Sequence, residues 1–512
     1  MDDDSSTSII QFHERMADTW CFAVVKVTGR SQIYQSLSLQ RLNFGRQTVA
    51  RLHQPHIMRQ LTFRIINLSL VGESHMNQFV SRVVCLLFLA LITTSEAKAA
   101  ELRAGVARRD FTPPLSMNSP LGGYGARMNQ PAIGVHDRIF GKALVLTDGN
   151  QRFALVTCDL LGLTFPMKPE IMKQLAADGW SADQILILPS HSHASIEMNA
   201  TNPNNVFGIP QIGIHDQKLY EFTVANFVEL IRDATKELLP VKIGTSSQEI
   251  EGWNRNRRGD STVTDNDLTI TRVDTLDKKP LAALVNFTAH PTFMTEKQML
   301  FSAGWPGSLQ QTMESAIGDG VTVMYYNGAQ GDQAPRSRPG SGSSRWEQSI
   351  RYGLDLGLLA TKQYENVITQ QDVEFGFHLQ PLDLPPRSWH PDFMSTGGRE
   401  YGLSEKLLLD LLPRMQPEHT VSGSLRLGDL LIIGIPGEMA AGMGMEVKAE
   451  AGRISGAAHP VIGGLANEWI SYILTADAYR TGRYEASISF YGETLGATIT
   501  KGALDGVRAL SQ

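Results

Sequence analysis

From residue 100 to the C-terminus, short apolar runs alternate with stretches that have helical spacing. The runs at residues 184–188 and 281–288 are rich in Leu, Ile and Val and are followed by turn residues, which is typical of buried strands. Between such runs, residues 220–239 and 345–364 carry apolar side chains at the spacing of an amphipathic helix. This alternation predicts an α/β protein, with mixed β-sheets flanked by helices in a single large domain at residues 100–512.

The same patterns predict the remaining elements of this domain. Strands are expected at residues 142–147, 152–158, 268–273 and 321–326, with two strands beginning at residue 373 and a strand pair at 421–435. Helices are expected at residues 169–178, 308–317, 404–412 and 440–451. The Pro-Gly-Ser-Gly-Ser-Ser stretch at residues 339–344 is expected to form a flexible loop.

Residues 76–99 have the organisation of a secretory signal peptide. Arg82 supplies the positive region, an apolar run follows at residues 83–92, and Ala97-Lys98-Ala99 is a small-x-small cleavage pattern. The apolar run is shorter than the roughly 20 residues that a bilayer span needs. We therefore expect a secreted or periplasmic mature chain without a stable membrane span, although a buried core helix would also fit this run. Residues 1–75 are interpreted as an over-extended gene model or a disordered segment, the alternative being a cytoplasmic extension before a signal anchor.

Charge argues against a nucleic-acid-binding protein, and cysteine content argues against a protein stabilised by disulfides. The formal net charge is −6 and no basic block occurs, so the sequence lacks the electrostatic footprint of a nucleic-acid-binding protein. Of the three cysteines, only Cys158 lies after residue 99. The mature chain therefore has no internal disulfide, and its stability is expected to come from core packing or a bound metal.

Four apolar runs end in polar residues that suit a metal site or catalysis. They are ILILPSHSH with His191 and His193, ALVNFTAHPT with His290, VMYYNGAQGDQAP with Asp332, and LLIIGIPGE with Glu438. In α/β proteins, ligands collect beyond the carboxyl ends of the strands. Two histidines and a carboxylate are a common ligand set for catalytic zinc. A lone histidine at a strand end is more often an ordinary core or surface residue, so the prediction of a metal site depends on the whole set.

These motifs and several others occur in the order found in a known family. RAGVARRDFTPP, GGYGAR (122–127), GVHDRIFGKALVL (134–146), LPSHSHAS, NRNRR (254–258), NFTAHPTFM (286–294), IPGEM (435–439) and residues 464–492 follow one another along the chain. In this order they resemble the catalytic domain of the neutral/alkaline non-lysosomal ceramidases. The resemblance runs from about Arg103 to Leu510.

The resemblance implies a zinc amidohydrolase with one Zn²⁺ per chain, acting on a small-molecule or lipid amide such as ceramide. His191, His290, Glu438 and Tyr472 match the family's zinc ligands, and His193, Arg257 and Tyr484 match residues that line its catalytic pocket. Arg255 is the alternative to Arg257, because it lies two residues away in the same motif. Asp332 is added as a further candidate catalytic residue. Zinc would activate the attack on the amide carbonyl, while Tyr and Arg donors would stabilise the oxyanion.

Three departures from the family's pattern bear on the substrate. Ala334 occupies the position of a serine to which the family assigns a catalytic role, and residues 302–307 lack the family's Asp-Asn. The family's C-terminal β-sandwich domain has no counterpart in the sequence up to Gln512. Two alternatives therefore stay open: a zinc hydrolase of the same fold with another amide or ester substrate, and a non-catalytic binding protein.

Overall fold

The computed structural model describes residues 8–16, 19–27, 40–41, 101–340 and 342–512 and divides the chain into two units, Met1–Thr93 and Thr94–Gln512. In the first unit, β1 (Ser8–Met16), β2 (Thr19–Val27) and β3 (Gln40–Arg41) form a three-stranded antiparallel sheet. The signal peptide expected at residues 76–99 lies outside the described residues.

The second unit is built on an eight-stranded mixed sheet with the order β14-β12-β11-β9-β4-β6-β7-β8. Its strands are β4 (Arg103–Asp110), β6 (Phe140–Thr147), β7 (Arg152–Cys158), β8 (Ile185–Pro189), β9 (Leu239–Glu249), β11 (Asp267–Thr275), β12 (Pro280–Phe287) and β14 (Thr322–Asn327). The pairs β7–β8 and β12–β14 are parallel and the other neighbours are antiparallel.

Helices cover one face of this sheet and a second sheet covers the other. The helices are α2 (Met167–Leu175), α3 (Gln217–Thr235), α4 (Gly304–Ile317) and α5 (Arg345–Glu365). Side chains alternate along β12, so that Ala283 and Val285 pack towards α4 and α5 while Ala282 and Leu284 pack towards the second sheet. Both faces are therefore buried, which explains why these strands read as continuous apolar runs.

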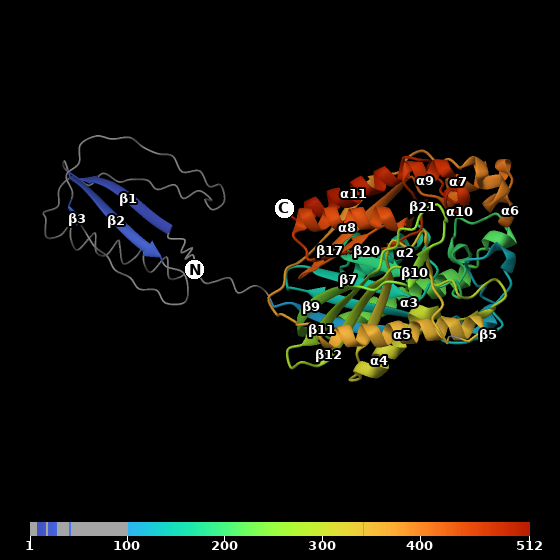
Figure 1. The fold of residues 1–512 in the computed structure, drawn as a ribbon, viewed down its shortest axis with the longest axis horizontal. Coiled ribbons are helices and arrows are strands. Elements are labelled where there is room, and N and C mark those ends of the chain that lie inside the picture. Colours follow the sequence, from blue (N-terminus) through green and yellow to red (C-terminus); the bar gives the residue numbers. More distant parts are fainter. Residues whose placement is uncertain (1–7, 17–18, 28–39, 42–100, 341) are drawn as a thin grey trace. The chain divides into compact units, whose positions relative to one another are not determined.

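The second sheet has the order β16-β17-β18-β20 and carries two helices on its outer face. These elements are β16 (Phe375–Asp383), β17 (His419–Leu427), β18 (Leu430–Gly434), β20 (His459–Gly463), α8 (Ala441–Ser455) and α11 (Leu495–Leu510). Figure 1 shows the resulting layers, with α8 and α11 over the second sheet and α4 and α5 on the opposite side.

Shorter elements complete the second unit. The two-residue and three-residue strands are β5 (Gly134–Val135), β10 (Asn254–Asn256), β13 (Leu300–Phe301), β15 (Gln333–Pro335), β19 (Glu438–Met439) and β21 (Tyr472–Ile473). The short helices are α6 (Gly397–Glu400), α7 (Glu405–Met415), α9 (Ala476–Thr481) and α10 (Arg483–Ser487). Single turns of 3₁₀-helix are η1 (Leu115–Met117), η2 (Gly125–Arg127), η3 (Ala176–Asp178), η4 (Ala182–Gln184), η5 (Met198–Thr201), η6 (Pro210–Ile212) and η7 (Pro391–Ser395).

The predicted fold class, mixed sheets flanked by helices, is confirmed. Two element predictions are wrong in detail. The helix expected at residues 220–239 ends at Thr235, because Leu239 already begins β9. Where two strands are expected between residue 373 and α7, β16 is the single strand in this described stretch. Within the described residues, no helix is long and apolar enough to cross a membrane.

Candidate functional site

The two outer strands of the eight-stranded sheet, β14 and β8, are joined by one side chain. Asn327 at the end of β14 donates from Nδ2 to the carbonyl oxygens of Ser190 and Ala289, at 3.2 and 2.9 Å. Its Oδ1 accepts hydrogen bonds from the backbone amides of Ala289 and Gly328. Ser190 precedes His191 and Ala289 precedes His290, so this buried amide brings the two histidine segments together.

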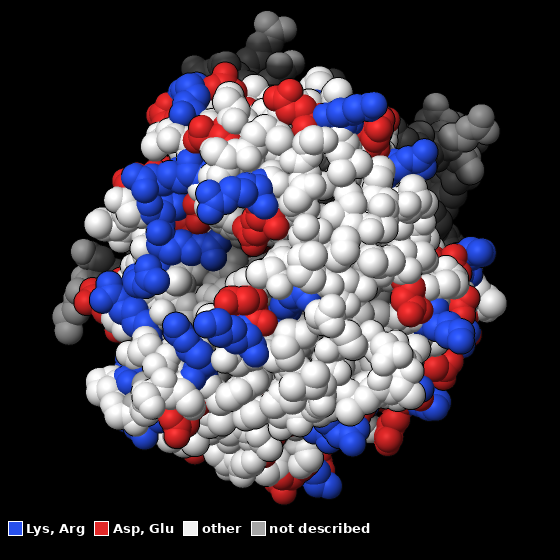
Figure 2. Space-filling view, turned by 90° about the vertical axis from the view of Figure 1, so that its right-hand side faces the viewer, with Lys and Arg blue, Asp and Glu red and all other residues white. Residues whose placement is uncertain are grey.

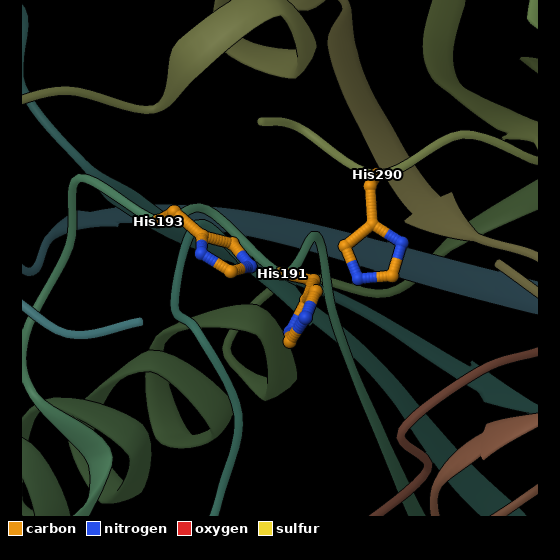
Figure 3. Close-up of side chains that lie close together, drawn as sticks. All are labelled: His191, His193 and His290. Atoms are coloured by element: carbon orange, nitrogen blue, oxygen red, sulfur yellow. The ribbon is translucent and has the colours of Figure 1, made fainter. Parts of the chain in front are cut away.

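Three histidines converge beside this bridge (Figure 3). One ligand atom from each of His191, His193 and His290 lies within 4.8 Å of the others, which positions the three rings to hold a metal ion. His191 has φ +70°, a left-handed conformation that is strained for a residue with a side chain. The cost of this strain is of order 1–3 kcal/mol. Residues with strained backbone conformations are frequent at functional sites, where the unusual conformation fixes the direction of the side chain.

Backbone carbonyls set the orientation of two of the rings. Nδ1 of His191 faces the carbonyl oxygen of Leu161, and Nδ1 of His290 lies 2.7 Å from the carbonyl oxygen of Gln330. A carbonyl oxygen can only accept, so each Nδ1 carries the proton and each Nε2 keeps its lone pair. Histidine ligands of metals are oriented by hydrogen bonds of this kind.

Glu438 supplies a carboxylate to the same point. Its Oε2 lies 2.9 Å from Nε2 of His290 and 3.4 Å from Nε2 of His191, and its Oε1 accepts a hydrogen bond of 2.8 Å from Nε1 of Trp469. Two ligand atoms of one tetrahedral zinc ion lie about 3.3 Å apart. In the described part of the chain, Nε2 of His290, Oε2 of Glu438 and both ring nitrogens of His193 have no hydrogen-bond partner. Buried polar atoms are rarely left in this state, so the donor set fits a metal ion.

Burial keeps the imidazoles of His193 and His290 neutral. Burial, reinforced by His191 and His290, lowers the pKa of His193 well below its ordinary value, and burial lowers the pKa of His290 to about 4. Burial opposes ionisation of Glu438, and the pKa of this carboxyl falls well below its usual range when a neighbouring imidazole, His191 or His290, carries a proton on Nε2. Neutral imidazole and carboxylate are the protonation states that bind a metal.

Tyr472 and Arg257 lie directly beside the carboxylate. Tyr472 is the register partner of Glu438 in the parallel pair β19–β21, and burial raises the pKa of its hydroxyl well above the ordinary value. Arg257 donates from Nη2 to the Tyr472 hydroxyl at 2.9 Å and from Nε to Glu485 at 3.0 Å. The structure therefore places Arg257, and not Arg255, next to the candidate metal ligands.

The two remaining candidates, Tyr484 and Asp332, lie in different surroundings. Tyr484 lies at the pocket entrance, 37% exposed, with its hydroxyl 3.3 Å from that of Tyr401. The Asp332 carboxylate accepts hydrogen bonds from Nδ2 of Asn256 at 2.7 Å, from Nε2 of Gln333 at 2.8 Å and from the backbone amide of Ala441 at 2.9 Å. Asp332 therefore ties β10 and β15 to the start of α8 and is not among the residues that line the pocket.

A cavity of about 150 Å³ contains His191, His193 and Glu438 at one end and extends between apolar side chains. Its apolar wall is formed by Met198, Ile212, Phe393, Leu403, Leu408, Leu411, Met415, Ile488 and Phe490. Towards solvent the site opens into a mouth cleft of about 540 Å³, lined by His193, Arg257, Thr292, Tyr472 and Tyr484 among others. The arrangement suits a ligand with an apolar chain on one side of a polar reacting group.

Comparison with known proteins places these features in one family. The model of the neutral/alkaline non-lysosomal ceramidase N-terminal domain matches residues 102–335 and 410–500. The chain belongs to the neutral/alkaline non-lysosomal ceramidase family. It is 21% identical over 497 residues to the neutral ceramidase of Pseudomonas aeruginosa, covering 81% of this chain and 73% of that protein. It is 27% identical over 242 residues to the neutral ceramidase of Drosophila melanogaster, covering 44% of this chain and 33% of that protein.

Solved structures give the same fold. The crystal structure of the neutral ceramidase from Pseudomonas aeruginosa superposes with a TM-score of 0.68 at 18% sequence identity, covering 80% of this chain and 74% of that chain. A second structure, described as ceramidase complexed with C2, gives the same TM-score of 0.68.

The ceramidase family model leaves residues 336–409 unmatched. Within the described part of this segment, Phe393, Tyr401, Leu403 and Leu408 line the apolar cavity, and they belong to η7, α7 and the turn between them. This segment therefore shapes the cavity with residues that the family model does not match.

Two supporting residues were missed in the sequence. In the sequence, Asn327 is the polar residue that ends an apolar run. Nothing in the surrounding sequence pattern predicts that its side chain joins two strands at opposite edges of a sheet. Trp469 lies within the family-like segment 464–492. Only the structure shows that its indole N–H donates a hydrogen bond to the carboxylate of Glu438. A polar residue at the end of each buried strand is the signal that could have identified Asn327.

Proposed function

We propose that this protein is a zinc-dependent amidohydrolase that cleaves an N-acyl amide with an apolar acyl chain, such as a ceramide-like lipid amide. The observation that carries the proposal is the set of unpartnered atoms on His193, His290 and Glu438 at the head of an apolar cavity. Family membership supports an amide-hydrolysing enzyme. The signal-peptide pattern of residues 76–99 supports a secreted or periplasmic location.

His191, His290, Glu438 and Tyr472, the set that the family resemblance implies, would hold the ion, and His193, which lies within reach of the same point, is left for proton transfer. Zinc, when bound, supplies a Lewis acid that polarises the amide carbonyl and lowers the pKa of water. His191 and His290 are held with their Nε2 atoms towards Glu438 by the carbonyls of Leu161 and Gln330. Arg257 holds the Tyr472 hydroxyl in place through its 2.9 Å hydrogen bond.

The remaining pocket residues handle the proton and the developing charge. Both ring nitrogens of His193 are free of hydrogen bonds, so this side chain can accept a proton from the attacking water and pass it to the leaving amine. Tyr484 lies at the entrance with a hydroxyl available to an oxyanion. Asp332 has a positioning role, because its carboxylate accepts a hydrogen bond from the backbone amide of Ala441 and so fixes the start of α8. Ala334 has no hydroxyl, so water is the nucleophile.

The test uses the full chain as expressed. We expect about one zinc per chain by elemental analysis, and release of fatty acid from a short-chain ceramide or a simple N-acyl amide that a chelator abolishes. His290→Ala should lose both metal and activity, while His193→Gln should keep the metal and lose activity. His419→Ala is the matched control, because this histidine is 74% exposed and pairs only with Asp383.

Two results would overturn the proposal. One is a protein that takes up no zinc even when zinc is supplied. The other is a His290→Ala variant with unchanged hydrolysis. Zinc binding without hydrolysis of any amide or ester would favour the alternative of a non-catalytic binding protein.

A further inference from the structure

A second cleft, of about 450 Å³, lies beside the mouth cleft and is lined by three arginines. We call it the arginine cleft; its lining residues are Arg255, Thr292, Phe293, Ala334, Pro335, Arg336, Ser337 and Arg345. Thr292 lines both the arginine cleft and the mouth cleft, so the two clefts are neighbours on either side of this residue. Figure 2 shows one face of the molecule on which Lys and Arg side chains, with some Asp and Glu among them, gather beside a hollow.

The three guanidinium groups are not neutralised by the protein. Within the described residues, no carboxylate lies within ion-pair distance of Arg255, Arg336 or Arg345, although most other arginines of the domain have such a partner. Glu251 shares a neighbouring cleft with Arg255 and Arg336 but forms no ion pair with either. Three positive charges on one cleft favour an anionic ligand.

The local structure holds these arginines at the cleft. Arg255 pairs with Ala334 in the antiparallel strands β10 and β15, and Arg336 donates from Nε to the carbonyl oxygen of Asn254 at 2.9 Å. Arg345 is the first residue of α5, whose N-cap Ser344 forms a capping box with Glu347. The charge of Arg345 reaches the mouth cleft, since it acts to lower the pKa of Tyr124, which burial raises to about 12.

The family model matches the segment that contains Arg255 but not those of the other two arginines, Arg336 and Arg345. Guanidinium groups present paired N–H donors that match the two oxygens of a carboxylate or phosphate. The cavity that contains His191 and His193 shares His193, Tyr472 and Tyr484 with the mouth cleft, and the mouth cleft shares Thr292 with the arginine cleft.

We propose that the amine half of the substrate carries an oxyanion, a carboxylate in its simplest form, which binds to Arg255, Arg336 and Arg345 while the acyl chain occupies the apolar cavity. This rests on the proposed amide hydrolysis and narrows its substrate class to amphipathic N-acyl amides with an anionic amine half. The hydrolysis itself adds water across the C–N bond, releasing a fatty acid and an amino acid or a similar anionic amine.

Matched ligands test the inference. The pairs are N-octanoylglycine with N-octanoylethanolamine, and N-octanoyl-4-aminobutyrate with N-octanoyl-4-aminobutanol, which differ only in a carboxylate against a hydroxymethyl group. Dissociation constants are measured by calorimetry on the full chain with zinc, and kcat/KM is measured for the same compounds. For at least one spacer length, we expect the carboxylate ligand to bind about tenfold more tightly than its neutral partner.

The variant Arg255→Gln/Arg345→Gln should bring that ratio of dissociation constants close to one. Arg351→Gln is the matched control, because Arg351 is exposed on the same helix α5 and pairs with Asp355. Equal binding of both members of each pair, or a ratio that the double variant leaves unchanged, overturns the inference even if both are hydrolysed. Arginine-dependent binding of the carboxylate without hydrolysis upholds the cleft and overturns the proposed function, so the two failures are distinguishable.

Discussion

Glu438 and Tyr472 are register partners in the two-stranded parallel sheet formed by β19 and β21. The backbone pairing places the carboxylate and the phenol hydroxyl on one side of the site, and Trp469 and Arg257 then orient each group by a hydrogen bond. The candidate metal site is therefore supported by backbone register and by residues around the ligands. Changes in those supporting residues should alter metal affinity while the fold persists.

Trp469→Phe removes the indole N–H that Glu438 uses, but it keeps most of the aromatic ring. We expect zinc affinity to fall about 10- to 100-fold, the usual effect of losing a group that orients a metal ligand. The measurement is a zinc dissociation constant from competition with a chromophoric chelator. Trp180→Phe is the control, because Trp180 is buried under Arg152 in another part of the domain. An unchanged zinc dissociation constant in Trp469→Phe would contradict the assignment of Glu438 as a ligand.

Asp332→Asn separates a positioning role from a catalytic one. All three donors to this carboxylate need an acceptor, and an asparagine offers only one oxygen, so a buried donor is left unpaired. The free energy of unfolding should fall by about 1–3 kcal/mol. Urea denaturation measures this, with Asp319→Asn at an exposed turn as control. A large fall in kcat with unchanged stability would instead show that Asp332 acts in the chemistry.

Local sequence patterns predicted most of the second unit, because buried strands and amphipathic helices carry periodicities of their own. His191, His290 and Glu438 could be chosen as partners because each follows an apolar run. Their convergence depends on Asn327 joining β14 to β8, and a contact between opposite edges of a sheet leaves no trace in spacing. The role of Asp332 was not accessible either, since a carboxylate at a strand end looks the same whether its donors come from the protein or from a substrate.

Glu468 gives a pH dependence of stability that is independent of the metal site. Its buried carboxylate accepts a hydrogen bond of 2.6 Å from Thr420, and burial raises its pKa from 4.5 to about 7. Between these values the folded chain binds more protons than the unfolded chain. The contribution of Glu468 to the free energy of unfolding is therefore complete below pH 4.5 and is lost as pH rises through about 7.

Glu468→Gln keeps the acceptor for Thr420 and removes the titration. Relative to wild type, its melting temperature should therefore rise progressively between pH 5 and pH 8, a range of pH set by the two pKa values above. Differential scanning calorimetry across this range measures the difference, with Glu405→Gln at the exposed start of α7 as control. A difference in melting temperature that does not vary with pH would show that Glu468 is ionised in the folded protein throughout.

Ala334→Ser tests whether the hydroxyl that the family pattern places here would reach the reacting group. Ala334 lines the arginine cleft and is not among the residues around the apolar cavity or the mouth cleft, and its backbone pairs with Arg255. A serine at this position should therefore change kcat/KM for an N-octanoyl amide by no more than about twofold, because its hydroxyl would lie outside the cavity and the mouth cleft. Ala182→Ser, at an exposed turn before β8, is the control. An increase of tenfold or more would place the hydroxyl at the substrate carbonyl and would overturn the assignment of water as the nucleophile.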